Sequence, residues 1–376
     1  MKKLAAALLA ASLLVLPAAA AEGGPQVESA AAVLMEKETG RVLYEKNAHD
    51  KLEPASVTKV MTLLLVMEAI DEGRLALDDM VTVSANAASM GGSQVYLKEG
   101  EQMSVNDMLK AVAVVSGNDA AVALAEHLAG SEAAFVERMN QRARELGMTD
   151  TCFVNCTGLP AAGHLTSAYD IALMSRALIA HSAIRQYTTI WMDSIRDGQF
   201  QLANTNKLVR FFEGTTGLKT GSTDSAGYCL SATAERDGME LIAVVLKADT
   251  SDKRFETAKS LLTFGFANYT LMDVYPSQAL PPIDVILGEQ ATVQPVLSRS
   301  SRILVDKTQI NNVTTDIHLC QDVEAPVEQG QILGEMSVRV GDEEIESIPI
   351  VADTGVSRLT IPGIFGRFLR QLFMAP

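Results

Sequence analysis

The chain changes character near Tyr275–Pro282, where a proline-rich segment separates two unlike stretches. Before this segment, helical periodicity alternates with strand patterns. After it, Ile283–Ile350 is rich in valine and isoleucine and is interrupted by turns, as in all-β proteins. The 376 residues are enough for two domains of ordinary size. The sequence therefore predicts a larger domain over residues 27–270 and a small all-β domain over residues 281–352.

The larger domain combines helices with strands but lacks a regular strand–helix–strand alternation. The helical patterns cover Ser56–Ile70, Ser104–Val115, Asp119–Ala129, Ser131–Leu146, Ser167–Ala180 and Phe255–Phe266. The strand patterns cover Ala31–Met35, Val42–Tyr44, Gly217–Gly221, Ala226–Glu235 and Met239–Leu246. Ser104 and Ser167 are each followed three residues later by an acid, which is the capping-box pattern. We therefore expect an α+β fold in which helices pack on an antiparallel sheet.

The start of the chain has the features of a secretory signal. Lys2 and Lys3 precede the short apolar stretch Leu4–Leu16, and the small residues Ala18–Ala21 offer a cleavage site. A membrane anchor is the alternative, but crossing a bilayer takes roughly 20 apolar residues. We therefore expect residues 1–21 to be removed on export. The formal net charge of -15 also argues against a nucleic-acid partner.

The end of the chain has a different pattern. In Ile364–Phe373 the bulky apolar residues recur at helical spacing, and Arg367, Arg370 and Gln371 share the opposite face. A basic amphipathic helix with aromatic residues is typical of a segment that lies in a membrane interface. The alternative is a terminal helix that packs on the β domain. We expect residues 358–376 to form a helix on the membrane surface.

Cysteines and histidines give little direction. The four cysteines Cys152, Cys156, Cys229 and Cys320 allow three pairings. Cys152 with Cys156 is the first pair to test, although small buried thiols are an equally good interpretation. The five histidines are scattered without the spacing of metal ligands. We therefore expect neither a metal site nor a cofactor.

A serine and a lysine stand three residues apart at the start of a long apolar helix. If this helix begins at Ser56, the Lys59 side chain lies about one turn along the same face. A serine hydroxyl needs a base to become a nucleophile, and a lysine can be that base where burial and positive charge lower its pKa. The apolar run Val60–Val66 would supply the buried setting. Alone the spacing is weak, because a capping serine followed by a solvated lysine has the same pattern.

Ser116, Gly117 and Asn118 lie at the predicted break between two helices. On a tight turn both polar side chains can point into a cleft, where Ser116 would relay a proton and Asn118 would hold a substrate amide. The same residues also suit a turn whose asparagine caps the next helix. Taken by itself, this motif favours the capping turn.

Lys219, Thr220 and Gly221 lie on a predicted strand. Lys219 offers a cation for a substrate carboxylate, and Thr220 offers a hydroxyl beside it. Because Gly221 has no side chain, a substrate backbone could approach the strand closely. The alternative is an exposed strand end with ordinary polar residues.

The three motifs together, in this order and behind an export signal, are far more specific than any one of them. S-x-x-K, S-D-N and K-T-G form the set found in class A β-lactamases and penicillin-binding proteins, and the middle motif here is S-G-N. The chain resembles the D-alanyl-D-alanine carboxypeptidases of the penicillin-binding protein 5 type. Further segments extend the resemblance over nearly all of the mature chain: Pro54–Thr62, Ser116–Ala120, Asn155–Pro160, Thr166–Asp170, Asn204–Leu208 and Gly217–Gly221.

The resemblance implies a DD-peptidase fold, with an antiparallel sheet flanked by helices, a small β domain and a terminal amphipathic helix. It also implies a serine-type D-Ala-D-Ala carboxypeptidase that removes the terminal D-alanine of peptidoglycan stem peptides through an acyl-enzyme on Ser56. β-Lactam antibiotics would acylate the same serine. The enzyme would be exported and held at the outer face of the cell membrane by its last helix.

The resemblance assigns the chemical steps to the first two motifs. Ser56 would attack the carbonyl between two D-alanines, with Lys59 as the general base. Ser116 would pass the proton to the leaving D-alanine, and Asn118 would orient the peptide.

The third motif would bind the end of the substrate. Lys219 and Thr220 would hold the terminal carboxylate beside Gly221. Arg254 is a second residue that could bind this carboxylate, and its alternative is a solvated charge. The backbone N–H groups of Ser56 and Ser222 would form the oxyanion hole. Relatives often carry a larger residue at position 222, which leaves the shape of the pocket open there.

Two other enzymes and one non-enzyme remain as alternatives. A class A β-lactamase needs a glutamate that activates the deacylating water, and no segment resembles the loop that carries it. A DD-endopeptidase would use the same residues on a cross-link. A wall-binding or β-lactam-sensing protein would keep its function after Ser56→Ala, whereas an enzyme would lose it.

Overall fold

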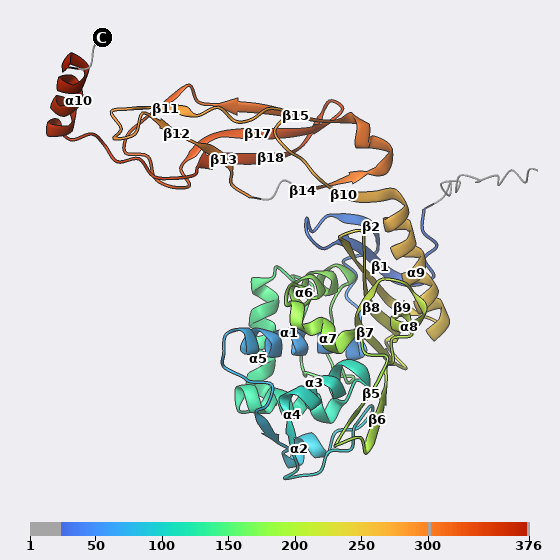
Figure 1. Cartoon of the computed structure of the whole chain (residues 1–376). Helices are drawn as coiled ribbons and strands as arrows, with labels where there is room; N and C mark the ends of the chain where they lie inside the picture. Colours follow the sequence, from blue (N-terminus) through green and yellow to red (C-terminus); the bar gives the residue numbers. More distant parts are fainter. Residues whose placement is uncertain (1–23, 300–301, 374–376) are drawn as a thin grey trace, which may run out of the picture.

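A computed structural model describes residues 24–299 and 302–373, except for the side chains of 367–372. The predicted signal segment, residues 1–21, lies outside this range. Figure 1 shows a body of helices around a sheet, followed by an elongated β part with the last helix at its far end. The expected combination of an α+β body and a small all-β part is confirmed.

The body is built on a five-stranded antiparallel sheet with the order β2-β1-β9-β8-β7. Its strands are β1 (Ser29–Glu36), β2 (Val42–Lys46), β7 (Thr215–Thr223), β8 (Gly227–Arg236) and β9 (Met239–Ala248). Because β1 pairs with β9, the start of the body is joined to strands that come much later in the chain. β7, which carries the third motif, forms one edge of the sheet.

Both faces of this sheet are covered. Along β1, Val33 contributes to one hydrophobic cluster and Leu34 to another, as expected for side chains that alternate across a strand. Helix α9 (Ser251–Asn268) packs on one face, and α6 (Ala168–Ala180) packs on the other. Burial on both faces explains why these strands are apolar throughout instead of alternating with polar residues.

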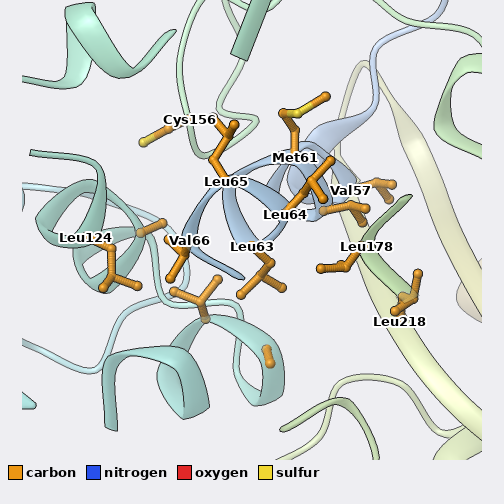
Figure 2. Packing of buried hydrophobic residues seen from close by; sticks show 14 of the residues in the cluster. Val57, Met61, Leu63, Leu64, Leu65, Val66, Leu124, Cys156, Leu178 and Leu218 are labelled. Carbon is orange, nitrogen blue, oxygen red and sulfur yellow. The ribbon is translucent and has the colours of Figure 1, made fainter. Parts of the chain in front are cut away.

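The segment that carries the first motif lies in the middle of the helical layer. The predicted helix Ser56–Ile70 consists of a 3-10 turn, η1 (Ala55–Thr58), followed by α1 (Lys59–Asp71). A helix that is apolar all round must be enclosed on every side. Figure 2 shows this enclosure, in which α1 is surrounded by residues of other elements, among them Leu124, Leu178 and Leu218. The first residue of α1 is therefore a lysine in an apolar environment.

Shorter elements complete the body. The helices are α2 (Ala85–Ala88), α3 (Val105–Val114), α4 (Asn118–Ala129), α5 (Glu132–Glu145), η2 (Ser182–Ile184), α7 (Arg185–Thr188) and α8 (Leu208–Phe211). Two short antiparallel pairs join β3 (Met80–Thr82) to β4 (Gln102–Ser104), and β5 (Met192–Ile195) to β6 (Phe200–Ala203), and the second pair is a hairpin. Both predicted caps are confirmed, because the Oγ atoms of Ser104 and Ser167 each accept a hydrogen bond from the backbone N–H of the residue three positions later.

The β part consists of two small sheets joined to the body by a ribbon of β10 (Tyr269–Asp273) and β14 (Arg302–Asp306). One sheet has the order β12-β11-β16 and the other the order β13-β18-β17-β15. Their strands are β11 (Ile283–Ile286), β12 (Thr292–Val293), β13 (Pro295–Leu297), β15 (Val313–Leu319), β16 (Asp322–Glu324), β17 (Ile332–Val340) and β18 (Glu343–Ala352). The turn predicted at Asn311–Asn312 is the end of a 3-10 helix, η3 (Lys307–Asn312).

The chain ends in α10 (Ile361–Phe373), where an amphipathic helix was expected. The side chains of Arg367, Arg370 and Gln371, which the sequence places on its polar face, lie outside the described residues. Within 24–299 and 302–373, no helix combines the length and the apolar character that crossing a bilayer requires.

All four cysteines are free thiols, so the pair Cys152–Cys156 proposed for testing is not a disulfide. Cys152 is exposed whereas Cys156 is buried, so the two thiols face different environments. Cys229 is also buried, and its sulfur contacts the carbonyl of Ala226. The interpretation as small buried residues therefore holds for two of the four.

Candidate active site

The first motif brings a serine and a lysine into contact. The Oγ of Ser56 and the Nζ of Lys59 are 3.0 Å apart. Ser56 lies in the 3-10 turn η1 and Lys59 begins α1, so local helical geometry alone aligns the two side chains. The solvated lysine of the alternative interpretation is wrong, because Lys59 is completely buried.

The Lys59 amine is surrounded by neutral acceptors. Nζ donates to Oδ1 of Asn118 at 2.6 Å and to the backbone carbonyl of Thr157 at 2.7 Å. Burial lowers the pKa of Lys59 to about 7, and the charges of Cys156 and Asp119 only partly oppose this effect. Near neutral pH a large fraction of this amine is therefore unprotonated.

The second motif meets the first through its asparagine. Asn118 is the first residue of α4, after the cap residue Gly117. Its Oδ1 accepts from Lys59, and its Nδ2 donates to the carbonyl of Gly91 at 2.6 Å. The asparagine therefore does not cap its own helix, and the capping-turn interpretation is wrong.

Ser116, two residues earlier, combines two unfavourable features. It is buried with a left-handed backbone, at φ 66°. Among the described residues its Oγ has no hydrogen-bond partner. An unpaired buried hydroxyl costs about 1–3 kcal/mol, and strained backbone of this kind is concentrated at functional sites.

The third motif places a second buried amine in the site. Lys219 on β7 is 1% exposed, and its Nζ donates to the carbonyl of Thr220 at 2.9 Å. Burial, followed by the positive charges of Lys59 and Arg254, lowers the pKa of Lys219 well below its usual value. The alternative of an exposed strand end is therefore wrong. The Oγ1 atoms of Thr220 and Thr205 are 2.7 Å apart.

Gly221 allows strand β7 to touch the turn η1 that carries Ser56. A Cβ at this position would lie 2.7 Å from the backbone nitrogen of Ser56 and 2.9 Å from the carbonyl oxygen of Pro54. A glycine is thus required here for a reason that the sequence did not suggest, because the position contacts the protein's own backbone. Ser222, the next residue on β7, is exposed.

Arg254 on α9 is buried behind the same end of β7. Its Nη1 donates to the carbonyls of Gly221 at 3.1 Å and Cys229 at 3.2 Å. Its guanidinium lies over the Phe255 ring, 4.6 Å from the centroid. Burial lowers the pKa of Arg254 to about 10. The interpretation of Arg254 as a solvated charge is therefore wrong.

Two contacts near Ser56 and Lys59 were not predicted. One is the carbonyl of Thr157, since a backbone acceptor leaves no trace in residue type. The other is His164, whose Nδ1 accepts the N–H of Val154 at 3.0 Å and whose Nε2 therefore donates to Oγ1 of Thr58 at 2.8 Å. Burial lowers the pKa of His164 to about 4. The signal available in the sequence was its place between two segments that carry the family resemblance.

The Thr58 hydroxyl connects His164 to the turn η1 that carries Ser56. It donates to the carbonyl of Ala55 at 2.9 Å, and Ala55 has a left-handed backbone at φ 48°. The same carbonyl would lie only 1.8 Å from a Cβ at Gly158. The segment around Gly158 and His164 therefore fixes the backbone on which Ser56 stands.

A cavity of about 730 Å³ lies at the other end of the central sheet, beside Glu36, Glu235 and Glu240. It contains none of the three motifs. In the described parts of the chain, no cluster of three or more histidine, cysteine or acidic side chains is arranged to hold a metal ion.

The comparisons with known proteins agree with these motifs. Residues 18–250 match the family "D-alanyl-D-alanine carboxypeptidase", and residues 273–358 match "Penicillin-binding protein 5, C-terminal domain". The D-alanyl-D-alanine carboxypeptidase DacF of Bacillus subtilis is 42% identical over 330 residues, which are 86% of this chain and 85% of that protein. DacC of Escherichia coli is 35% identical over 352 residues, covering 91% and 87% of the two chains.

Solved structures show the same likeness. Penicillin-binding protein 5 of Haemophilus influenzae is 30% identical and has a TM-score of 0.80. The match covers 89% of this chain and 99% of that chain. Penicillin-binding protein D2 of Listeria monocytogenes, in its ampicillin-bound form, is 36% identical with a TM-score of 0.59. The match covers 64% of this chain and 98% of that chain.

Proposed function

Since the chain belongs to the D-alanyl-D-alanine carboxypeptidase family and is a serine-type D-Ala-D-Ala carboxypeptidase, we propose that Ser56 is its nucleophile and Lys59 its general base. The observation that carries this assignment is the set of three contacts around the Lys59 amine. Its two neutral acceptors, from Asn118 and Thr157, can only accept hydrogen bonds.

A neutral amine has two N–H groups and one lone pair. The oxygens of Asn118 and Thr157 take the two N–H groups, which leaves the lone pair for the third contact, the Ser56 hydroxyl. A pKa of about 7 makes this neutral form available at physiological pH. The surroundings of Lys59 thus supply both the protonation state and the orientation that a base requires.

The proposed reaction begins with proton transfer from Ser56 Oγ to Lys59 Nζ. The oxygen attacks the carbonyl carbon between the two D-alanines, and the carbonyl oxygen becomes an oxyanion. The C–N bond then breaks, and the leaving D-alanine takes the proton from Lys59 through the Ser116 hydroxyl. Water hydrolyses the resulting ester and restores Ser56. The unpaired, buried Oγ of Ser116 supports its part in this relay.

The substrate's terminal carboxylate is assigned to the positive end of the site. Lys219 and Thr220 bind it, and the Arg254 charge lies behind them. The backbone N–H groups of Ser56 and Ser222 receive the oxyanion, and the side chain of Asn118 orients the peptide. Support comes from the burial of Lys219 and Arg254, and from the nearby Arg254 charge, which together with burial lowers the pKa of Lys219.

D-alanine release tests the nucleophile. Ser56→Ala should release no D-alanine from a peptide that ends in D-Ala-D-Ala, whereas Ser347→Ala on the β part should leave the rate unchanged. Release that persists in Ser56→Ala would contradict the assignment. Rapid hydrolysis of penicillin by the wild type would instead indicate a β-lactamase.

We further propose that the enzyme is exported and is held on the membrane surface by α10. Large apolar side chains on this helix are exposed, with Ile361 83% and Phe365 63% accessible. The helix also lies at the far end of the β part from the body (Figure 1). A helix with unburied apolar residues and arginines in its sequence suits an interface with anionic lipids.

Co-sedimentation with vesicles of anionic phospholipid tests this attachment. The full chain should sediment with the vesicles, and Phe365→Asp should weaken that binding by several-fold. Ile332→Asp, which changes an equally exposed apolar residue on the β part, is the control and should bind normally. An equal loss of binding in both variants would contradict a role for α10. So would a wild type that does not bind the vesicles.

A further inference from the structure

A second cavity, of about 590 Å³, lies between the Tyr96–Glu101 loop and the turn of the hairpin β5–β6. Its lining is aromatic and charged, and consists of Tyr96, Lys98, Glu99, Gly100, Glu101, Arg196, Gln199 and Phe200. A volume of this size is typical of small-molecule sites. None of these residues belongs to the three motifs.

The loop that forms one wall of this cavity is attached to the active site. The backbone N–H of Asn118 donates to the carbonyl of Ser93 at 2.7 Å, and its side chain donates to that of Gly91. Tyr96 follows Ser93 by three residues and so lies within about 10 Å of this contact, given the reach of an extended chain. The cavity is therefore a short distance from the residue that holds the Lys59 amine.

Tyr96 is held rigidly by its backbone on both sides. The N–H groups of Val95 and Leu97 each donate to Oδ2 of Asp119 at 3.0 Å. The carbonyls of Val95 and Tyr96 accept from the Arg196 guanidinium at 2.8 Å and 3.3 Å. Asp119 directly follows the asparagine of the second motif, and Arg196 belongs to the β5–β6 turn. The loop is thus fixed from the catalytic helix and from the hairpin at once.

The side chain gains little from this arrangement inside the protein. Tyr96 has a left-handed backbone at φ 56°, which a tyrosine adopts only at a cost, and its side chain is 69% exposed. Its ring meets the Phe200 ring edge-on, with centroids 6.3 Å apart. Packing therefore does not account for a strained and firmly held aromatic residue that points into solvent.

We propose that Tyr96 and Phe200 form a platform for a sugar ring of the peptidoglycan glycan strand. This proposal rests on the proposed function, because the peptides that the enzyme cleaves are carried on that glycan. The apolar face of a pyranose packs on an aromatic ring, and its hydroxyls both donate and accept hydrogen bonds.

The charges around the cavity favour a neutral ligand over an ionic one. Two cations, Lys98 and Arg196, are matched by two anions, Glu99 and Glu101, and Arg196 is already paired with Glu101 at 2.8 Å. A charged ligand would gain no net attraction from such a rim. Neutral hydroxyl groups can bond to both kinds of side chain, so the saccharide is the part of the substrate that this cavity suits.

Ligand-observed saturation-transfer NMR with N,N′-diacetylchitobiose as the probe tests the platform directly. The wild type should bind this disaccharide, with or without prior treatment with penicillin. Tyr96→Ala should lose the signal, and Tyr96→Phe, which keeps the ring, should retain it. The control is Tyr275→Ala, which removes a tyrosine of the same 69% exposure next to the β part. Absence of binding to the wild type would overturn the proposal.

Kinetics with two substrates sharpen the test. For a pentapeptide attached to the disaccharide, Tyr96→Ala should lower kcat/KM about fivefold to tenfold, the size of one aromatic contact. For the free pentapeptide the change should stay below about twofold. An equal fall for both substrates would overturn the proposal and make Tyr96 a residue that merely positions the Asn118 loop.

The failure of the proposed function would be visible separately. In that case the wild type would release D-alanine from neither peptide. The NMR measurement would still decide whether the Tyr96–Phe200 platform binds a saccharide.

Discussion

The body and the β part bury very different residues. The body encloses several charged side chains, among them Lys59, Lys219, Arg254 and Glu240. In the described stretch of 281–352, Ser337 is the only polar residue that is buried. Burying a charge is costly unless it is paired. The contrast therefore shows that the cost of buried charge falls on the body and not on the β part.

Within the body, a second contrast separates paired from unpaired buried charge. Glu240 is buried at the far end of the sheet, but it is paired with Lys37 at 2.8 Å and Arg185 at 2.7 Å. Lys59, Lys219 and Arg254 form no ion pair with any carboxylate of the described residues. The uncompensated positive charge of Lys219 and Arg254 is suited to a substrate that brings its own carboxylate.

The largest expected effect comes from removing the buried base. Lys59→Met keeps an apolar stem but has no lone pair for the Ser56 proton, so acylation by penicillin should slow by about 10²–10⁴-fold. Lys307→Met, in the η3 helix of the β part, should leave the rate unchanged. Stopped-flow measurement of acylation compares the two variants, and near-normal acylation of Lys59→Met would remove the general-base assignment.

Next in size is the effect of adding one methyl group at the contact between β7 and η1. Gly221→Ala places a Cβ within 2.9 Å of backbone atoms of Pro54, Ser56 and Val57. The nucleophile turn must move, and a shift of about 1 Å can cost about 100-fold in rate. Gly24→Ala is the matched control, because its Cβ would meet nothing within 4 Å. Similar rates for the two variants would show that this contact does not position Ser56.

The pH dependence should reveal the two lysines. Only unprotonated Lys59 can accept the serine proton, so kcat/KM should fall about tenfold for each pH unit below about 7. His164, with a pKa of about 4, stays neutral in this window and contributes no limb. Lys219 must stay charged to bind a carboxylate, and its lowered pKa makes binding weaken at a lower pH than for an ordinary lysine. A flat profile between about pH 5.5 and 8 would contradict these roles.

The smallest effect on catalysis should come from a strongly destabilising substitution in the core of the β part. We propose that residues 281–352 form a separate domain, in which Ile348 is fully buried beside Met336 and Ile350. Ile348→Ala should cost this domain about 2–5 kcal/mol of unfolding free energy, while acylation by penicillin changes less than about twofold. Thermal unfolding and stopped-flow acylation measure the two quantities. Loss of acylation in step with stability would show that the two regions fold as one.

The sequence predicted the parts of the site that depend on local geometry. Three-residue spacing at a helix start was enough to place Lys59 against Ser56, and an apolar helix was enough to bury it. The helix caps at Ser104 and Ser167 followed for the same reason. The convergence of the three motifs came from the family resemblance, since no local pattern brings β7 to the start of α1.

The remaining features depend on contacts between backbones that are distant in the sequence. The carbonyl of Thr157, the support from His164 and the reason for Gly221 all arise where separate segments meet. Residue type alone does not predict such contacts. The sequence therefore explained Gly221 by the approach of a substrate backbone and gave His164 no role. Arg254 stays a predicted carboxylate-binding residue, and its burial became clear only from the packing of α9 against the sheet.

The assignment of Ser56 as the nucleophile is central to the proposed mechanism, and one measurement tests it directly. The mature protein is exposed briefly to penicillin, its intact mass is recorded, and the adduct is located by peptide mapping. A stable penicilloyl group on Ser56 is the expected result, and Lys59→Met should form it far more slowly. An adduct on another residue, or intact drug with no adduct, would contradict the assignment of Ser56 and Lys59.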